Sequence, residues 1–200
     1  MREVERVEGM SKSSNKWVLI DGGGNSGKTT IIEYLKKLGY SIKSEQATLV
    51  INDSLNEGIK MKQLVSDPEV AAKFQEDIAT RELNEERKFK DEELVFFDRA
   101  CIDYAGVTKL RNLKQKPEIL DMVKDRSYAL AVIPDILPGS FTNNRTESVD
   151  NDPYLASKRL ERAIIEVIEA RGIPILRLPV VGVEARVDMI LEECRSRGVM

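Results

Sequence analysis

Short apolar runs alternate with longer amphipathic stretches along most of the chain. The apolar runs predict β-strands, and several are apolar at nearly every position, as central strands covered on both faces are. The predicted strands cover residues 17–21, 40–44, 94–98, 128–134 and 173–178. Because strands that alternate with helices favour a parallel sheet with helical crossovers, the pattern predicts an α/β fold.

The amphipathic stretches predict helices, because their apolar residues recur at helical spacing. These helices cover residues 28–38, 67–91, 153–172 and 183–194. Local signals mark their ends: Gly39 suits the C′ position after the first helix, and Asp152 with Pro153 supplies an N-cap followed by a proline at N1. In the last helix Cys194 falls on the apolar stripe, so we expect it in the core.

Two segments lack this periodicity. Residues 1–16 are polar and rich in serine, so they are predicted to form a flexible leader. Residues 137–152 are polar and contain proline, glycine and asparagine, which predicts a loop able to act as a lid. The remainder, residues 17–200, has the size of one domain. The apolar runs are too short to span a membrane and the leader lacks a signal-peptide core, so we expect a cytoplasmic protein.

The composition narrows the available chemistry. The chain contains no histidine, which excludes Ser-His-Asp and Cys-His machinery and HExxH zinc sites. The two cysteines, Cys101 and Cys194, form no metal-binding spacing and are expected to be reduced thiols. A net charge of −3 disfavours a dedicated nucleic-acid binder. Catalysis must therefore rely on carboxylates, lysine, arginine, hydroxyls, backbone amides and a bound cation.

A phosphate-binding turn is the most specific motif in the chain. Residues 22–29 match the pattern GxxxxGK[ST] at every fixed position, between a predicted strand and a predicted helix. Glycines let the backbone N–H groups converge on phosphate oxygens, and the helix N-terminus adds its dipole. In this motif the lysine reaches the β- and γ-phosphates and the final hydroxyl ligates Mg²⁺. The predicted nucleotide-binding residues are Gly22, Gly23, Gly24, Asn25, Ser26, Gly27, Lys28, Thr29 and Thr30.

The strand at residues 94–98 ends in an aspartate, Asp98. We expect this carboxylate beside the phosphate-binding turn, where it is suited to orient Mg²⁺, because neighbouring parallel strands end at the same edge of a sheet. The next residue is Arg99, whereas many mechanical ATPases have a glutamate there to orient water. A guanidinium favours gripping a phosphate or an acidic acceptor. The chain also lacks an [NT]KxD motif, which disfavours a GTPase switch.

Three segments resemble a compact, AAA-type P-loop family that includes nicotinamide riboside kinase-like domains and is similar to thymidylate and other nucleoside or nucleotide kinases. They are the phosphate-binding turn, residues 98–103 (D-R-A-C-I-D) and residues 144–147 (N-R-T-E). The resemblance extends over residues 17–193. It implies a three-layer α/β/α sandwich with a five-stranded parallel sheet in the order 2-3-1-4-5 and a lid over the phosphates.

The resemblance also implies roles for individual residues. Lys28 and Thr29 would serve the phosphates and Mg²⁺, and Asp98 would be a metal-orienting carboxylate or the base for an acceptor hydroxyl. Arg99 would clamp the acceptor or a phosphate, and Arg145 would close on the transferring phosphoryl group from the lid.

Further residues are candidates for the acceptor side. Arg81 continues an apolar stripe in the charged helix, so it should either extend along the surface or point into a cleft. Gln75 is loosely similar to a base-binding glutamine of deoxynucleoside kinases. Asp21, directly before the turn, is expected to hold a lid residue. The acceptor-side candidates are Glu45, Gln75, Arg81 and Asp103.

These features together predict a phosphotransferase that uses Mg²⁺ and ATP, with GTP as an alternative donor, on a nucleoside, nucleotide or similar small acceptor. Two other functions remain open from the sequence. One is a regulatory protein that binds ATP or GTP and uses the lid as a switch, and the other is a slow nucleoside triphosphatase.

Overall fold

A parallel sheet forms the centre of the computed structural model, which describes residues 15–139 and 152–200. Within these residues five strands pair in the order β2-β3-β1-β4-β5, as predicted. Each strand lies inside its predicted range and is one or two residues shorter. The strands are β1 (Trp17–Ile20), β2 (Ser41–Lys43), β3 (Val95–Asp98), β4 (Leu130–Pro134) and β5 (Ile175–Leu178).

The register of the central strands brings their carboxyl ends together. Ile20, the last residue of β1, is aligned with Asp98 at the end of β3 and with Val132 in β4. The backbone therefore enters the phosphate-binding turn directly beside Asp98. This alignment places the two motifs of the sequence at one edge of the sheet.

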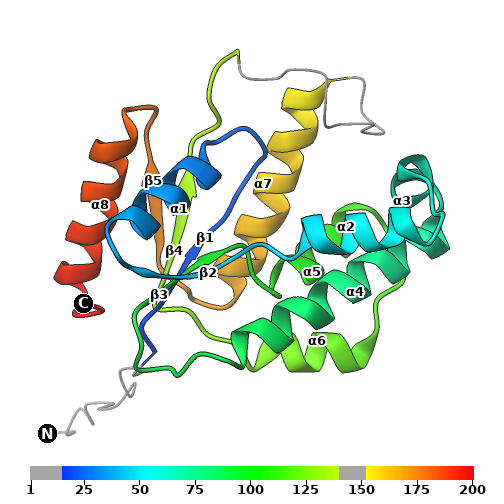
Figure 1. The fold of residues 1–200 in the computed structure, drawn as a ribbon, viewed down its shortest axis with the longest axis horizontal. Coiled ribbons are helices and arrows are strands. Elements are labelled where there is room, and N and C mark those ends of the chain that lie inside the picture. Colours follow the sequence, from blue (N-terminus) through cyan, green and yellow to red (C-terminus); the bar gives the residue numbers. More distant parts are fainter. Residues whose placement is uncertain (1–14, 140–151) are drawn as a thin grey trace, which may run out of the picture.

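Helices cover both faces of the sheet, and alternate residues of each strand point to opposite sides. Val18 and Ile20 pack with α1 (Lys28–Lys37) and α8 (Val183–Ser196). Trp17 and Leu19 face the other layer. That layer contains α4 (Pro68–Glu86), α5 (Asp103–Leu110), α6 (Pro117–Lys124) and α7 (Pro153–Ala170). The result is the predicted three-layer sandwich (Figure 1).

Four helices were not predicted from the apolar pattern. They are α5, α6, α2 (Ala47–Asn56) and α3 (Met61–Ser66). Each is ten residues or shorter, which gives periodicity few turns in which to appear. Figure 1 shows α2 and α3 beside α4, on the side of the domain away from α8. They form one wall of the cavity described below.

Two predicted boundaries were wrong. Helix α4 ends at Glu86, not near residue 91, because the carbonyls of Lys90 and Asp91 accept hydrogen bonds from the Trp17 indole and the Lys16 amide in a turned segment. The predicted leader is too long, because Asn15 is buried and donates to the Ser127 carbonyl at 2.8 Å.

The rest of the predicted leader, residues 1–14, lies outside the described residues, as do residues 140–151. This second range contains Arg145 and most of the predicted lid. Among the helices that the structure describes, none has the length and apolar content needed to cross a membrane.

Candidate functional site

The phosphate-binding turn joins β1 to α1 through residues with left-handed backbone. Gly22 and Gly27 have φ of 116° and 83°, and Asn25 has φ of 55°. The turn curls around Lys28, whose Nζ donates to the carbonyl of Gly23 at 2.6 Å. Thr29 is exposed in the first turn of α1, as is the following threonine. The arrangement fits a triphosphate held by backbone amides, with a lysine beside it and a hydroxyl ready for a metal.

The charged form of the Lys28 side chain is disfavoured in this position. Burial lowers the pKa of its ammonium group to about 8, and the nearby Arg99 acts in the same direction. The carboxylates of Asp21 and Asp98 oppose this effect in part. Because an opposite charge favours the protonated lysine, a phosphate in the turn would remove part of the penalty. Lys28 is thus a buried cation whose charged form a bound phosphate would stabilise.

Two buried side chains from helices that are distant in the sequence donate hydrogen bonds to backbone carbonyls of the phosphate-binding turn. Ser157 in α7 donates to the Gly24 carbonyl at 2.9 Å, and Arg186 in α8 donates to the Ser26 carbonyl at 2.6 Å. The sequence analysis missed both residues. Arg186 is only 3% exposed and precedes Val187 at the edge of the apolar stripe of α8, which is a signal that could have identified it.

The close approach of Ser157 leaves no room for a side chain at Gly23. A Cβ at this position would lie 2.7 Å from Ser157 Oγ and 2.9 Å from Ile136 Cδ1. Overpacking of this kind costs about 1–3 kcal/mol, so the Gly23→Ala variant should bind ATP roughly tenfold more weakly. Gly24→Ala is the matched control, because its Cβ would meet Ser157 Oγ at an ordinary 3.5 Å. Calorimetric titration with ATP checks this, and equal affinities would contradict it.

Arg99 connects the ends of three neighbouring strands. Its Nη1 lies 3.2 Å from Asp21 Oδ1 after β1 and 3.3 Å from Asp103 Oδ2 at the start of α5. Its Nε lies 3.1 Å from Glu45 Oε1 after β2. Burial alone would lower the pKa of the guanidinium, but these carboxylates raise it above its usual value. Arg99 itself follows β3 with a φ of 61°, a conformation that is uncommon outside glycine.

Asp21 contacts both the phosphate-binding turn and Arg99, and the lid residue expected to meet it lies outside the described residues. The Oδ1 atom of Asp21 accepts the Gly22 amide at 2.7 Å and pairs with Arg99. Burial raises the pKa of Asp103 well above its usual value, and the charge of Asp21 and a hydrogen bond between the two carboxyls act in the same direction. This carboxyl pair links the phosphate-binding turn to α5.

A buried ion pair contacts the backbone carbonyls of Asp98 and Arg99. Lys43 at the end of β2 pairs with Glu82 of α4 and donates to the carbonyl of Arg99 at 2.8 Å. Lys43 Nζ also lies 3.4 Å from the Asp98 carbonyl. The sequence analysis missed Lys43 and Glu82, although a lysine within a predicted strand was a visible signal. Burial raises the pKa of the Asp98 carboxyl, and Glu45 raises it further.

A cavity of about 910 Å³ opens beside Arg99, between α2, α3, α4, α5 and α7. Most of its lining is apolar, with Phe74, Ile78 and Tyr104 among the larger side chains. Its size is typical of a small-molecule site. The predicted residues that line it are Glu45, Gln75, Arg99 and Asp103. Arg81 does not line it, because its guanidinium pairs with Asp53 of α2, a helix that was not predicted.

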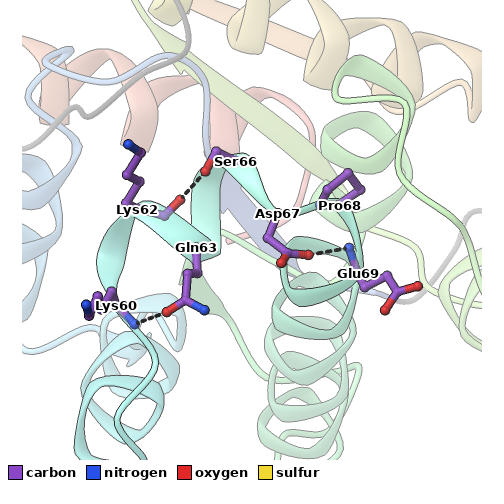
Figure 2. Close-up of a pocket in the computed structure, with 7 residues that line it drawn as sticks. All are labelled: Lys60, Lys62, Gln63, Ser66, Asp67, Pro68 and Glu69. Carbon is purple, nitrogen blue, oxygen red and sulfur yellow. Dashed lines mark hydrogen bonds between the residues drawn. The ribbon is translucent and has the colours of Figure 1, made fainter.

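A second hollow, of about 780 Å³, lies over α3 and the start of α4 (Figure 2). Its polar groups cap these helices: Gln63 Oε1 accepts the Lys60 amide at 3.0 Å, and Asp67 Oδ1 accepts the Glu69 amide at 3.1 Å. No residue of the phosphate-binding turn lines it. Its lining consists of Lys60, Lys62, Gln63, Ser66, Asp67, Pro68 and Glu69. We therefore assign the functional site to the turn, the Arg99 cluster and the larger cavity.

A family model described as an AAA domain matches residues 17–186. No curated protein matches the chain significantly. Among solved structures, the deoxyadenosine kinase from M. mycoides with dCMP and dCDP bound has a TM-score of 0.64 and 18% identity, covering 90% of this chain and 98% of that chain.

Two other solved structures share the fold. The NadR protein in complex with NR has a TM-score of 0.63 and 14% identity, and the match covers 92% of this chain and 50% of that chain. Thymidylate kinase from Candida albicans has a TM-score of 0.60 and 14% identity, and the match covers 92% of this chain and 93% of that chain. At these identities the likenesses establish a P-loop kinase fold.

Proposed function

Since the chain belongs to the AAA domain family, we propose that it is a phosphotransferase that uses Mg²⁺-ATP to phosphorylate a small acceptor of the nucleoside or nucleotide class. The observation that carries this proposal is the junction of two sites. Arg99 lines the 910 Å³ cavity and pairs with Asp21 at the entrance to the phosphate-binding turn. A hydrolase needs room only for water, whereas this cavity has room for a second organic substrate.

The donor side consists of the phosphate-binding turn. Its backbone amides and Lys28 bind the phosphates, and the Thr29 hydroxyl and the Asp98 carboxylate are the residues that would hold the metal. When bound, Mg²⁺-ATP would supply the phosphoryl group, and the charge of the cation would offset the negative charge on the phosphoryl group as it is transferred. GTP is the alternative donor. Arg145 lies outside the described residues, and we propose that it is the lid cation that closes on the transferring phosphoryl group.

The acceptor side is assigned to the cavity. Gln75 is 8% exposed and lines the cavity. Its amide can both donate and accept hydrogen bonds, so it is suited to bind a ligand such as the edge of a base. Asp98 is assigned one of two roles, a ligand of the metal or the base that accepts the proton of the acceptor hydroxyl. Its raised pKa makes the carboxylate a stronger base than an exposed aspartate.

The Asp98→Asn variant tests this assignment. It should phosphorylate the acceptor roughly a hundredfold more slowly, because general base catalysis typically contributes at least that factor. ATP affinity measured without magnesium should stay within about threefold of wild type, because the phosphates are assigned to the backbone amides and Lys28. Both quantities are measured by steady-state kinetics and by titration.

The matched control is Asp121→Asn, in an exposed carboxylate that pairs with Lys124 on α6. An unchanged rate in Asp98→Asn would remove Asp98 from the mechanism. Phosphate release by the wild-type protein that is independent of any acceptor would instead favour a nucleoside triphosphatase. ATP binding with no turnover would favour a regulatory protein.

A further inference from the structure

Arg186 is a buried arginine that joins three separate parts of the chain. It lies near the start of α8, and its Nε donates to the Pro179 carbonyl after β5 at 2.9 Å. Its Nη1 donates to the Ser26 carbonyl in the phosphate-binding turn at 2.6 Å. Its Nη2 lies 3.4 Å from the Asp135 carbonyl after β4. The guanidinium therefore connects the phosphate-binding turn to the ends of β4 and β5.

The positive charge of Arg186 is not neutralised by a neighbouring carboxylate. Among the residues that the structure describes, no carboxylate forms an ion pair with it. Asp135 is the acidic residue whose charge acts on Arg186, but its Oδ1 pairs with Arg177 at 2.6 Å. Burial lowers the pKa of the Arg186 guanidinium, although an arginine stays protonated in a protein. Arg186 is thus a buried cation held by backbone carbonyls.

The buried cations in the described part of the chain differ in whether they are paired. They are Lys28, Lys43 and Arg186. Lys43 pairs with Glu82, whereas Lys28 and Arg186 have no ion-pair partner among the described residues. Both of these unpaired cations donate to carbonyls of the phosphate-binding turn. Because a buried charge without a partner is unfavourable, two such charges on one turn indicate a site that a bound anion completes.

The hydrogen bond from Arg186 also sets the direction of a backbone amide. The peptide between Ser26 and Gly27 is planar and trans, so its carbonyl and its N–H point to opposite sides. Because Arg186 binds the carbonyl from the side of α8, the Gly27 amide is turned away from α8. A cation on the carbonyl also polarises the peptide and makes its N–H a stronger donor. One side chain thus supplies a charge to the turn and orients one of its amides.

We propose that Arg186 is a positioning residue for the triphosphate, which orients the Ser26–Gly27 peptide and adds its positive charge to that of Lys28. This inference rests on the proposed use of a nucleoside triphosphate and adds a second cation to the site that binds it. It does not depend on the identity of the acceptor. Arg186 acts on the phosphates of the nucleotide and not on its nucleoside end.

The Arg186→Met variant tests the inference, because methionine keeps a long side chain and removes both the charge and the donors. The ATP affinity of the full chain, measured by calorimetric titration, should fall about thirtyfold, as the loss of a hydrogen bond to a charged group predicts. Arg195→Met, in an exposed arginine of α8, is the matched control and should bind ATP as the wild type does. Unchanged ATP affinity in Arg186→Met would overturn the inference.

Inorganic triphosphate separates an effect on the phosphates from a general disturbance of the fold. When it competes with ATP, its affinity for Arg186→Met should fall by the same factor as that of ATP. A loss of affinity for ATP alone would assign Arg186 to the nucleoside end of the ligand and contradict the proposal.

A conservative variant keeps the test decisive if Arg186→Met does not fold. Arg186→Lys retains the charge but lacks the planar fork of donors, so both ATP and inorganic triphosphate should bind about fivefold more weakly than to the wild type. Wild-type affinity in Arg186→Lys would show that the geometry of Arg186 has no part in binding. If the wild-type protein binds ATP but phosphorylates no acceptor, the proposed kinase is removed, and the affinities of the Arg186 variants still decide this inference.

Discussion

Replacing Lys28 by methionine should lower the kcat/KM of phosphotransfer about a thousandfold, because its ammonium is the cation aimed into the phosphate-binding turn. The fold should persist, because burial already disfavours the charge of Lys28 in the protein without nucleotide, as its lowered pKa shows. Steady-state kinetics and a thermal melt measure the two quantities. Lys36→Met, in an exposed lysine of the same helix, is the control.

The same residue should make ATP binding dependent on pH. Its pKa is about 8 before ATP binds, and the added phosphate charge raises it. Above about pH 8 the free protein holds Lys28 neutral, so binding takes up a proton and affinity falls as the pH rises. Calorimetry in buffers of different ionisation enthalpy detects this proton, which should be absent from Lys28→Met. Equal proton uptake by the variant and the wild type would assign the titration to another group.

The second large effect is expected from Lys43→Met. It should lower the free energy of unfolding by about 3–5 kcal/mol, because Glu82 would stay buried without its cation. The side chains of Lys43 and Glu82 are 1% and 2% exposed, so solvent screens the pair little. Burial raises the pKa of Glu82 to about 7 even with Lys43 beside it. The pKa of Glu82 in the folded protein is above its value in the unfolded chain. Keeping this carboxylate buried therefore costs more free energy of folding as the pH rises. The loss measured by urea unfolding should be larger at pH 8 than at pH 6.

A double variant separates stability from positioning. Lys43→Met with Glu82→Gln removes the unpaired charge, and glutamine still accepts the Gln46 amide that Glu82 Oε1 accepts at 3.1 Å. Most of the stability should return. Phosphotransfer should remain impaired, because the carbonyl of Arg99 has lost the donor that holds it at 2.8 Å. Full recovery of kcat in the double variant would show that Lys43 serves the fold alone.

The sequence was most informative where a pattern is local. The apolar strands and the phosphate-binding turn depend on residues that are close in the chain, so both could be recognised directly. Asp98 ends β3 and Glu45 comes shortly after β2. Because the predicted strand order makes these two strands neighbours, it also placed the two carboxylates at one edge of the sheet. Partnerships across the fold were harder to predict, because Lys43 and Glu82 meet only through the packing of α4 on β2. The position of Arg81 was missed for a related reason, because its partner Asp53 lies in a helix without a recognisable period.

The contact between Arg186 and the Ser26 carbonyl joins residues that are 160 positions apart. A ribosome releases the turn at residues 22–29 long before it releases α8, so the earlier segment emerges without one of its supports. A growing chain that stops short of α8 lacks a donor for this carbonyl and has not completed its nucleotide site. Nucleotide binding and the docking of α8 are thus thermodynamically linked, and each stabilises the other. Completion of the site is therefore a late event in synthesis, although its motif is among the first parts of the chain to be made.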